Sequence, residues 1–166
     1  MRSGSHHRRL SLQRGLAYLG VLMIAFMVGL GTMQAARVWG KIRQREQETQ
    51  LLFVGDQYRN AIEHYYKSAE GSRYPESLED LLADKRVPYT LRHLRRLYDD
   101  PLTGKAEWGL VKAPDGRIMG VYSQAPGTPQ KQGGFPDRYQ AFAGKSSYQD
   151  WTFVYKPPEA QTAQPQ

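Results

Sequence analysis

The residue types that could carry out chemistry are few in this chain and are not grouped along it. The 166 residues include four histidines and no cysteine, which excludes disulfides, thiolate metal ligands and cysteine nucleophiles. His64 is followed by two tyrosines in a predicted helix, and His93 lies in an arginine-rich turn. Neither histidine has a partner at the spacing of a metal or catalytic site, so we interpret both as structural. We therefore expect that the chain is not an enzyme.

A cluster of basic residues is the second candidate for a binding function. Its members are Arg92, His93, Arg95 and Arg96, with Lys85 and Arg86 close by. Such a cluster can neutralise phosphates or contact an acidic partner. No ladder of aromatic residues for base stacking accompanies it. We interpret it as a solvated face or a contact with an acidic neighbouring protein, and we do not expect nucleic acid as a partner.

These candidates must be positioned by the rest of the chain, which starts with a basic leader and a long apolar run. Segment 16–36 has no Asp, Glu, Lys, Arg or His over 21 residues, and roughly 20 residues cross a membrane. The net charge is +7, and arginines flank the run on both sides, so charge bias leaves the orientation ambiguous. We expect the short leader to remain inside while the larger domain is exported.

A cleavable signal peptide is the alternative interpretation of this N-terminus. Small residues at Ala35 and Ala36 could mark the cleavage site. However, the run exceeds the roughly 7–15 residues of a typical signal-peptide core, and Gln34 occupies a position where a small residue is preferred. We therefore predict a retained transmembrane helix over residues 16–38.

Small side chains form a stripe within this predicted membrane helix. Ala25, Gly29, Thr32 and Ala36 follow one another at spacings of four, three and four residues, which places them on one helix face. Such a stripe allows another helix to approach closely in lipid. The alternative is that glycine and alanine are simply common in membrane helices.

The helical pattern continues beyond the apolar run, over residues 39–71. Apolar residues recur every three or four positions from Leu51 to Ala69, which is typical of a helix with one buried face. Gly71 supplies a stop signal. Residues 41–50 are highly charged and lack an apolar face, so we expect them to be solvated or packed against polar partners.

The remaining sequence predicts a small α+β domain. A helix is predicted to start at Pro75, and a basic helical turn is predicted within YTLRHLRRLYDDPLTG. There Asp99 and Asp100 are expected to shape the turn at Pro101 rather than bind metal. The runs AEWGLVKA and RIMGVYSQ predict a hairpin, and DWTFVY predicts a third strand. Between them, residues 125–147 are expected to form a loop.

In this order, four features resemble the type IV pilin and type II secretion pseudopilin superfamily. They are the basic leader ending at Arg14-Gly15, the apolar helix from Leu16, its continuation RQREQETQLLFVGDQYRNAIEHYY, and the block YPESLEDLL, DDPLTG, WGLV. The resemblance covers nearly the whole chain and is greatest to the secretion-type pseudopilins. It implies an α+β, pilin-like fold, in which a long N-terminal helix with a membrane-spanning first half carries a small antiparallel sheet.

The resemblance also implies processing of the precursor. A prepilin peptidase cuts such chains on the cytoplasmic side after a glycine, and the new N-terminus is commonly methylated. Here the cut would fall between Gly15 and Leu16, where the family usually has Phe after the cut. The family's fifth residue is usually a Glu that pairs with a neighbour's terminal amine, and this chain has Gly20 there. We therefore expect a minor or specialised subunit.

Calcium is the one cofactor that the resemblance suggests. Secretion-type pseudopilins often hold calcium in the C-terminal loop region. Asp137 and Asp150 are the only acids in segment 117–156, which makes them the candidate ligands, although calcium requires six to eight oxygens. We favour the alternative that both residues form turns or helix caps.

Together these features predict a membrane-anchored structural subunit of a type II secretion or type IV pilus machine. We expect a single pass through the bacterial inner membrane, with a cytoplasmic N-terminus and a periplasmic C-terminal domain. The expected partners are other pilin-like subunits, the inner-membrane assembly platform, the prepilin peptidase and membrane lipid. The alternative is a bitopic envelope protein whose small domain binds a ligand, a partner or DNA, without a filament role. The expected segments are a leader (1–15), a transmembrane helix (16–38), its extramembrane continuation (39–71), a globular domain (72–156) and a disordered tail (157–166).

Overall fold

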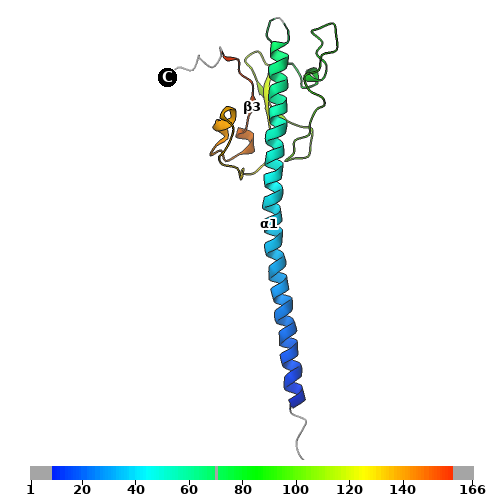
Figure 1. Cartoon of the computed structure of the whole chain (residues 1–166), viewed down its shortest axis with the longest axis vertical. Coiled ribbons are helices and arrows are strands. Elements are labelled where there is room, and N and C mark those ends of the chain that lie inside the picture. The colour runs from blue at the N-terminus through cyan, green and yellow to red at the C-terminus, as the bar shows by residue number, and fades with distance from the viewer. Residues whose placement is uncertain (1–8, 70, 159–166) are drawn as a thin grey trace, which may run out of the picture. The chain divides into compact units, whose positions relative to one another are not determined.

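Helix α1, Arg9–Lys67, is the longest element of the chain (Figure 1). The computed structural model describes the backbone of residues 9–69 and 71–158, and it describes the side chains of α1 over residues 17–27 and from residue 39 onward. The chain divides into two compact units, Met1–Arg43 and Gln44–Gln166. Most of the predicted tail, from residue 159, lies outside the described residues.

Over residues 17–27 of the first unit, α1 presents an uncharged surface. All the side chains described between Ala17 and Met27 are exposed, and the large apolar ones are 49–68% exposed. The predicted transmembrane segment 16–38 includes residues 28–38, whose side chains lie outside the described part of the chain. Among the residues that the structure describes, no helix combines the length and the apolar character that crossing a membrane requires.

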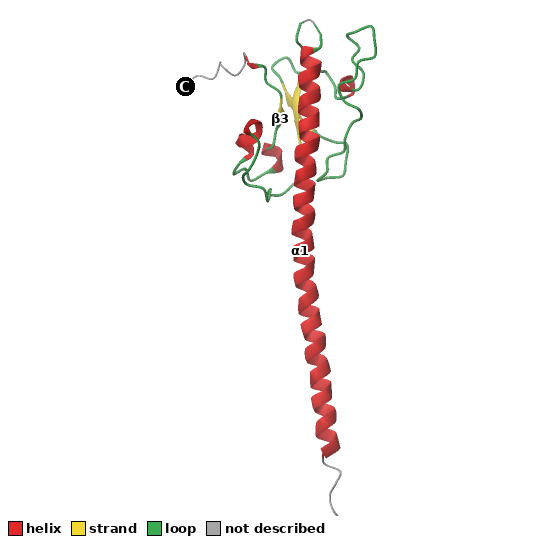
Figure 2. Cartoon of the chain, viewed as in Figure 1, coloured by secondary structure: helices red, strands yellow, loops and turns green. Residues whose placement is uncertain are grey.

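The second unit combines the remainder of α1 with a small antiparallel sheet (Figures 1 and 2), which makes the fold α+β. The strands are β1 (Gly109–Lys112), β2 (Ile118–Tyr122) and β3 (Phe153–Val154), in the order β1-β2-β3. Val121 of β2 pairs with Leu110 on one side and with Phe153 on the other. The predicted hairpin and third strand are therefore confirmed.

The apolar stripe of α1 forms one side of the core, as its spacing predicted. Its buried members are Leu51, Val54, Tyr58, Ala61, Ile62 and Tyr65. Gly55 lies on the same helix, and the Phe153 ring packs against it. A Cβ at this position would overlap that ring. The glycine thus permits close approach of α1 and β3, in the same way that small residues allow backbones to come together elsewhere.

Aromatic rings fill much of the core between η2 and the sheet. The short 3-10 helices η2 (Asp137–Phe142) and η3 (Tyr148–Asp150) carry Phe142 and Tyr148. The Phe142 ring stacks on Trp151, with centroids 5.6 Å apart, and meets Phe153 edge-on at 5.3 Å. The predicted 125–147 loop is therefore only partly irregular, because two aromatic residues of η2 are drawn into the core.

Two helix predictions downstream of α1 are wrong. Pro75 starts no helix, because its carbonyl accepts a hydrogen bond from the Ile118 N–H of β2, and only the single turn η1 (Glu79–Leu81) follows. No helix forms in segment 89–98 either, which Figure 2 shows as loop. There the N–H groups of His93 and Leu94 both donate to the Leu81 carbonyl, at 2.9 Å. Long-range partners thus replace the local bonds of a helix.

Of the two acids predicted to shape the turn at Pro101, Asp100 does so, whereas Asp99 is exposed. Asp100 is fully buried, and its Oδ1 accepts the Leu102 N–H at 2.9 Å. Its Oδ2 accepts the Ser123 hydroxyl at 2.6 Å. Asp100 therefore shapes the turn and fastens it to the segment that follows β2.

Candidate functional site

The uncharged surface of α1 in the first unit is the first candidate site. Eight large apolar side chains, from Tyr18 to Met27, are exposed there. Because successive helical residues are rotated by about 100°, eleven consecutive residues cover the whole circumference of a helix. A helix that is apolar all round requires an apolar environment, such as a protein core or lipid.

The charged segment at the start of the second unit contacts polar partners, which is one of the two outcomes predicted for it. Glu48 is 2% exposed, and its carboxylate accepts the N–H groups of Gln130 and Lys131 at 2.6 and 3.0 Å. Tyr148 donates its hydroxyl to the same carboxylate at 2.7 Å. Gln44 adds a hydrogen bond from its side-chain amide to the Tyr148 hydroxyl at 2.8 Å. This contact, which we call the Glu48 clamp, fixes loop 128–131 to α1.

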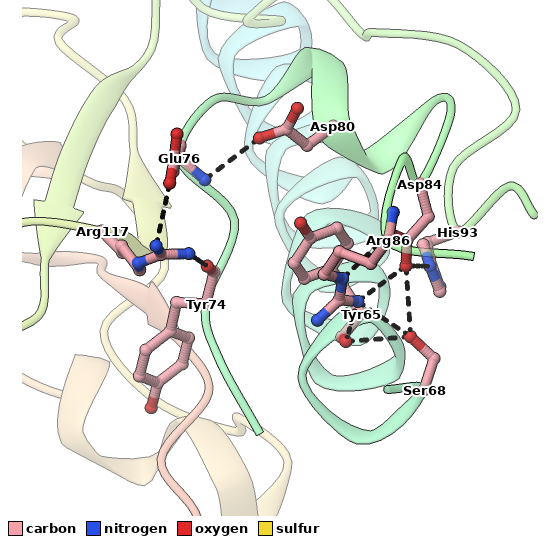
Figure 3. Close-up of polar contacts among 9 residues, drawn as sticks. All are labelled: Tyr65, Ser68, Tyr74, Glu76, Asp80, Asp84, Arg86, His93 and Arg117. Carbon is pink, nitrogen blue, oxygen red and sulfur yellow. Dashed lines mark hydrogen bonds and ion pairs between the residues drawn. The ribbon is translucent and has the colours of Figure 1, made fainter. Parts of the chain in front are cut away.

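A second polar contact lies at the C-terminal end of α1 (Figure 3). The Arg86 guanidinium donates to the Tyr65 carbonyl and to the Asp84 carboxylate, each at 2.6 Å. It also lies 3.5 Å from the centroid of the Tyr65 ring. Carbonyls in the last turn of a helix lack helical partners, so Arg86 caps α1. We call this contact the Arg86 cap.

His93 joins the Arg86 cap rather than the basic surface predicted for it. Its Nε2 lies 3.1 Å from Asp84 Oδ2, and its side chain is 4% exposed. Asp84 is held chiefly by its hydrogen bonds from Arg86, and these keep the pKa of the Asp84 carboxyl well below its usual range. His64, in contrast, is exposed on α1. Its ring is not part of the cap.

The side chains around Asp84 do not form a nucleophilic triad. Ser68 lies close to Asp84 and His93 in Figure 3, but its hydroxyl donates to the Tyr65 carbonyl at 3.0 Å. Its other contacts are with Asp84, at 3.4 Å, and Arg86, at 3.0 Å. Activation of a serine requires a hydrogen bond from its hydroxyl to a base, and the serine here contacts the orienting carboxylate instead of the imidazole. The geometry fits a helix cap.

The predicted basic cluster is divided by the structure. Arg92, Arg95 and Arg96 are exposed, whereas His93 and Arg86 belong to the cap. Arg96 lies over the Tyr98 ring, 5.1 Å from its centroid. Three arginines and the nearby Lys85, all exposed, therefore remain from the cluster.

The two candidate calcium ligands occupy separate short helices. Asp137 is the first residue of η2 and Asp150 is the last residue of η3, and both are exposed. Within the described part of the chain, no group of three or more Asp, Glu, His or Cys residues could hold a metal ion. Loop 128–131, which precedes both residues in the sequence, is held by the Glu48 clamp, through a carboxylate on α1.

The remaining predicted positions concern the N-terminal segment. Gly15 and Leu16, at the proposed processing site, and Gly29, Thr32 and Ala36 of the small-residue stripe lie outside the residues whose side chains are described. Ala25 is the one member of the stripe that is described, and it is exposed.

Two shallow hollows in the second unit bring together residues that are distant in the sequence. One, of about 590 Å³, is lined by cations from α1, η2 and the segments after them. These cations are Arg59, Arg138, Lys145 and Lys156. The other, of about 440 Å³, is lined by Glu76, Glu79 and Glu107. Their spacing in the sequence carries no common pattern, so the sequence did not identify either group.

Comparison of the chain with protein-family models, curated proteins and solved structures finds no match.

Proposed function

We propose that this chain is a membrane-anchored, pilin-like structural subunit of a type II secretion or type IV pilus machine. The observation that carries the proposal is the exposed, uncharged stretch of α1 from Ala17 to Met27. The same helix continues into the second unit and provides one side of the core of an α+β domain. A single helix that is apolar at one end and packed in a domain at the other suits a subunit that is anchored by that helix.

The free energy of burial supports lipid or neighbouring helices as the environment of this stretch. Moving a large apolar side chain from water into an apolar environment stabilises it by about 1.5–3 kcal/mol. The uncharged run in the sequence extends from residue 16 to residue 36, which is longer than the stretch whose side chains are described. We propose the bacterial inner membrane as its location, with the second unit in the periplasm.

The contacts between α1 and the loops of the second unit support a structural role. The Glu48 clamp and the Arg86 cap both fasten loops of the domain to α1. In these contacts the Glu48 carboxylate accepts backbone N–H groups and the Ser68 hydroxyl donates to a backbone carbonyl. The domain is thus built to hold its helix, as a subunit that assembles through that helix requires.

The anchor is tested with the full-length chain expressed in a bacterium. Membranes are washed with alkaline carbonate, and the chain is followed by immunoblot in the pellet and the supernatant. We expect the wild-type chain in the pellet. Ile24→Arg should move it toward the supernatant, because a charge within an apolar helix costs about 2.5–3.5 kcal/mol near the bilayer centre. Ile42→Arg is the matched control, since Ile42 is exposed on α1 but lies beyond the uncharged run.

The filament role is tested separately in a strain that carries a secretion or pilus machine of this type. The tagged chain should copurify from detergent extracts with other pilin-like subunits or with the assembly platform. A wild-type chain in the carbonate supernatant would exclude the anchor. A chain in the membrane pellet that copurifies with none of these components would instead favour the bitopic envelope protein, whose domain acts alone.

A further inference from the structure

The two hollows lie on opposite faces of the sheet. Leu110 of β1 lines the acidic hollow, whereas Val111, the next residue of the same strand, lines the basic hollow. Because successive side chains of a strand point to opposite faces, the two hollows open on different sides of the second unit. One surface of the domain thus carries the cations, and another carries the carboxylates.

The formal charges of the two hollows are opposite in sign and equal in size. The basic hollow has four cationic residues and one acid, Asp150, which gives it a formal charge of +3. The acidic hollow has three glutamates and no Lys or Arg in its lining, which gives it a formal charge of −3. Each hollow also contains apolar residues, among them Val154 in the basic one and Leu110 in the acidic one. Leu110 is 40% exposed.

Only part of this charge is neutralised within the domain. Arg59 pairs with Glu63 and Arg138 pairs with Asp56, each at 3.1 Å, and Glu76 pairs with Arg117 at 2.8 Å. Within the described residues, the other five charged side chains of the two hollows form no ion pair. These are Lys145, Lys156 and Asp150 in the basic hollow and Glu79 and Glu107 in the acidic hollow.

We propose that the basic hollow of one copy of this chain contacts the acidic hollow of the next copy. This inference rests on the proposed function, because it identifies the partner of the filament subunit as a second copy and assigns the two faces through which copies meet. Lys145 and Lys156 of one copy face Glu79 and Glu107 of its neighbour. The exposed Leu110 and the apolar floor of the basic hollow are covered at the centre of the contact.

The position of the hollows determines the kind of assembly. A contact between two different faces is heterologous, so each copy that joins leaves one free face of each kind. Copies can therefore add head to tail without limit unless the rotation between them closes a ring. An open head-to-tail assembly of this kind is what a repeating filament subunit needs, whereas Gly20 in the sequence favoured a minor subunit.

The contact is tested by crosslinking full-length chains in membranes. The chain contains no cysteine, so Glu107→Cys and Lys145→Cys introduce the only two thiols, one in each hollow. A thiol-specific reagent with a spacer of about 10 Å should then give a ladder of dimers, trimers and larger species on a denaturing gel. Glu107→Cys alone should give no dimer, because like hollows do not meet. Arg92→Cys combined with Lys145→Cys is the matched control, since Arg92 is exposed and lies outside both hollows.

Charge reversal within the double-cysteine chain tests the electrostatic origin of the contact. Lys156→Glu or Glu79→Lys alone should lower the yield of the ladder roughly fivefold, because each places like charges opposite one another. The two reversals together should restore it. Arg95→Glu changes the charge equally at an exposed position outside the hollows, and it should leave the ladder intact. Salt should weaken the ladder of the unreversed chain, because exposed charges are screened.

Each outcome bears on the contact separately from the anchor. No ladder from a chain that remains in the carbonate-washed pellet overturns the contact and leaves the anchored function standing. Dimers from Glu107→Cys alone, or equal ladders from the Arg92 control, also overturn it. A ladder from a chain that is found in the carbonate supernatant would support the contact and exclude the membrane anchor.

Discussion

Glu48 and Tyr148 are 100 residues apart in the sequence and are joined by a hydrogen bond of 2.7 Å. The phenol donates to a carboxylate that also accepts two backbone N–H groups. Burial, and then this hydrogen bond, raise the pKa of Tyr148 to about 12. The contact therefore stabilises the fold fully below pH 10, the ordinary pKa of tyrosine. This stabilisation is lost as the pH rises from there to about 12.

Replacing Glu48 with alanine should destabilise the second unit by on the order of 3 kcal/mol, because buried donors lose their acceptor. Thermal unfolding of the full chain in detergent, followed by near-ultraviolet circular dichroism, measures the loss. Glu46→Ala is the control, since Glu46 is exposed two residues away, and it should change the stability by less than about 0.5 kcal/mol. Equal effects of the two variants would show that the clamp contributes nothing specific.

Replacing Asp84 with asparagine should remove an acid-sensitive part of the stability. The pKa of Asp84 is lowered chiefly by the hydrogen bonds from Arg86. A group of this kind stabilises the fold above its unfolded pKa, which is about 4, and the stability is lost as the pH falls below that value. Asp84→Asn should lower the melting temperature at pH 7 and flatten its decline below pH 4. Asp99→Asn, at an exposed acid that takes no part in the Arg86 cap, should keep the wild-type decline.

Replacing Gly55 with alanine should destabilise the domain, although alanine is the better helix former by about 1 kcal/mol. The new methyl group would overlap the Phe153 ring, and overpacking of this kind typically costs 1–3 kcal/mol. Gly40→Ala on the same helix is the matched control, because a Cβ there meets no atom within 4 Å. Chemical denaturation should show opposite signs for the two variants, and a stabilised Gly55→Ala chain would contradict the packing.

Replacing Gly15 with a bulky residue should leave the precursor uncut in a strain that has a prepilin peptidase. This prediction depends on the sequence, since the side chains of this segment lie outside the described residues. Mass spectrometry of the membrane-extracted wild-type chain should find a mature N-terminus at Leu16. A wild-type chain that retains the leader in that strain would exclude processing at Gly15.

The parts of the fold that the sequence predicted are those with a regular period. The stripe from Leu51 to Tyr65 is buried as expected, because one helix face must be covered when apolar residues recur every three or four positions. The alternation of Trp151, Phe153 and Tyr155 predicted a strand, and all three side chains are buried. In both cases, local spacing alone determines which side chains point the same way.

The parts that the sequence did not predict depend on contacts between distant residues. His93 lies in an arginine-rich sequence, but the backbone bonds of its segment to Leu81 turn it inward, toward Asp84. Glu48 lies in a charged segment that could equally have been solvated, and it is buried because loop 128–131 offers it two N–H groups. No local sequence pattern indicates pairings between distant residues, and for the same reason the sequence did not predict the charged hollows.

The Glu48 clamp and the Arg86 cap hold α1 near the start and at the end of its part in the second unit. Between them, the Phe153 ring packs against the helix at Gly55. A pulling force along the helix axis is therefore shared among three attachments, because each joins α1 to a different segment of the domain.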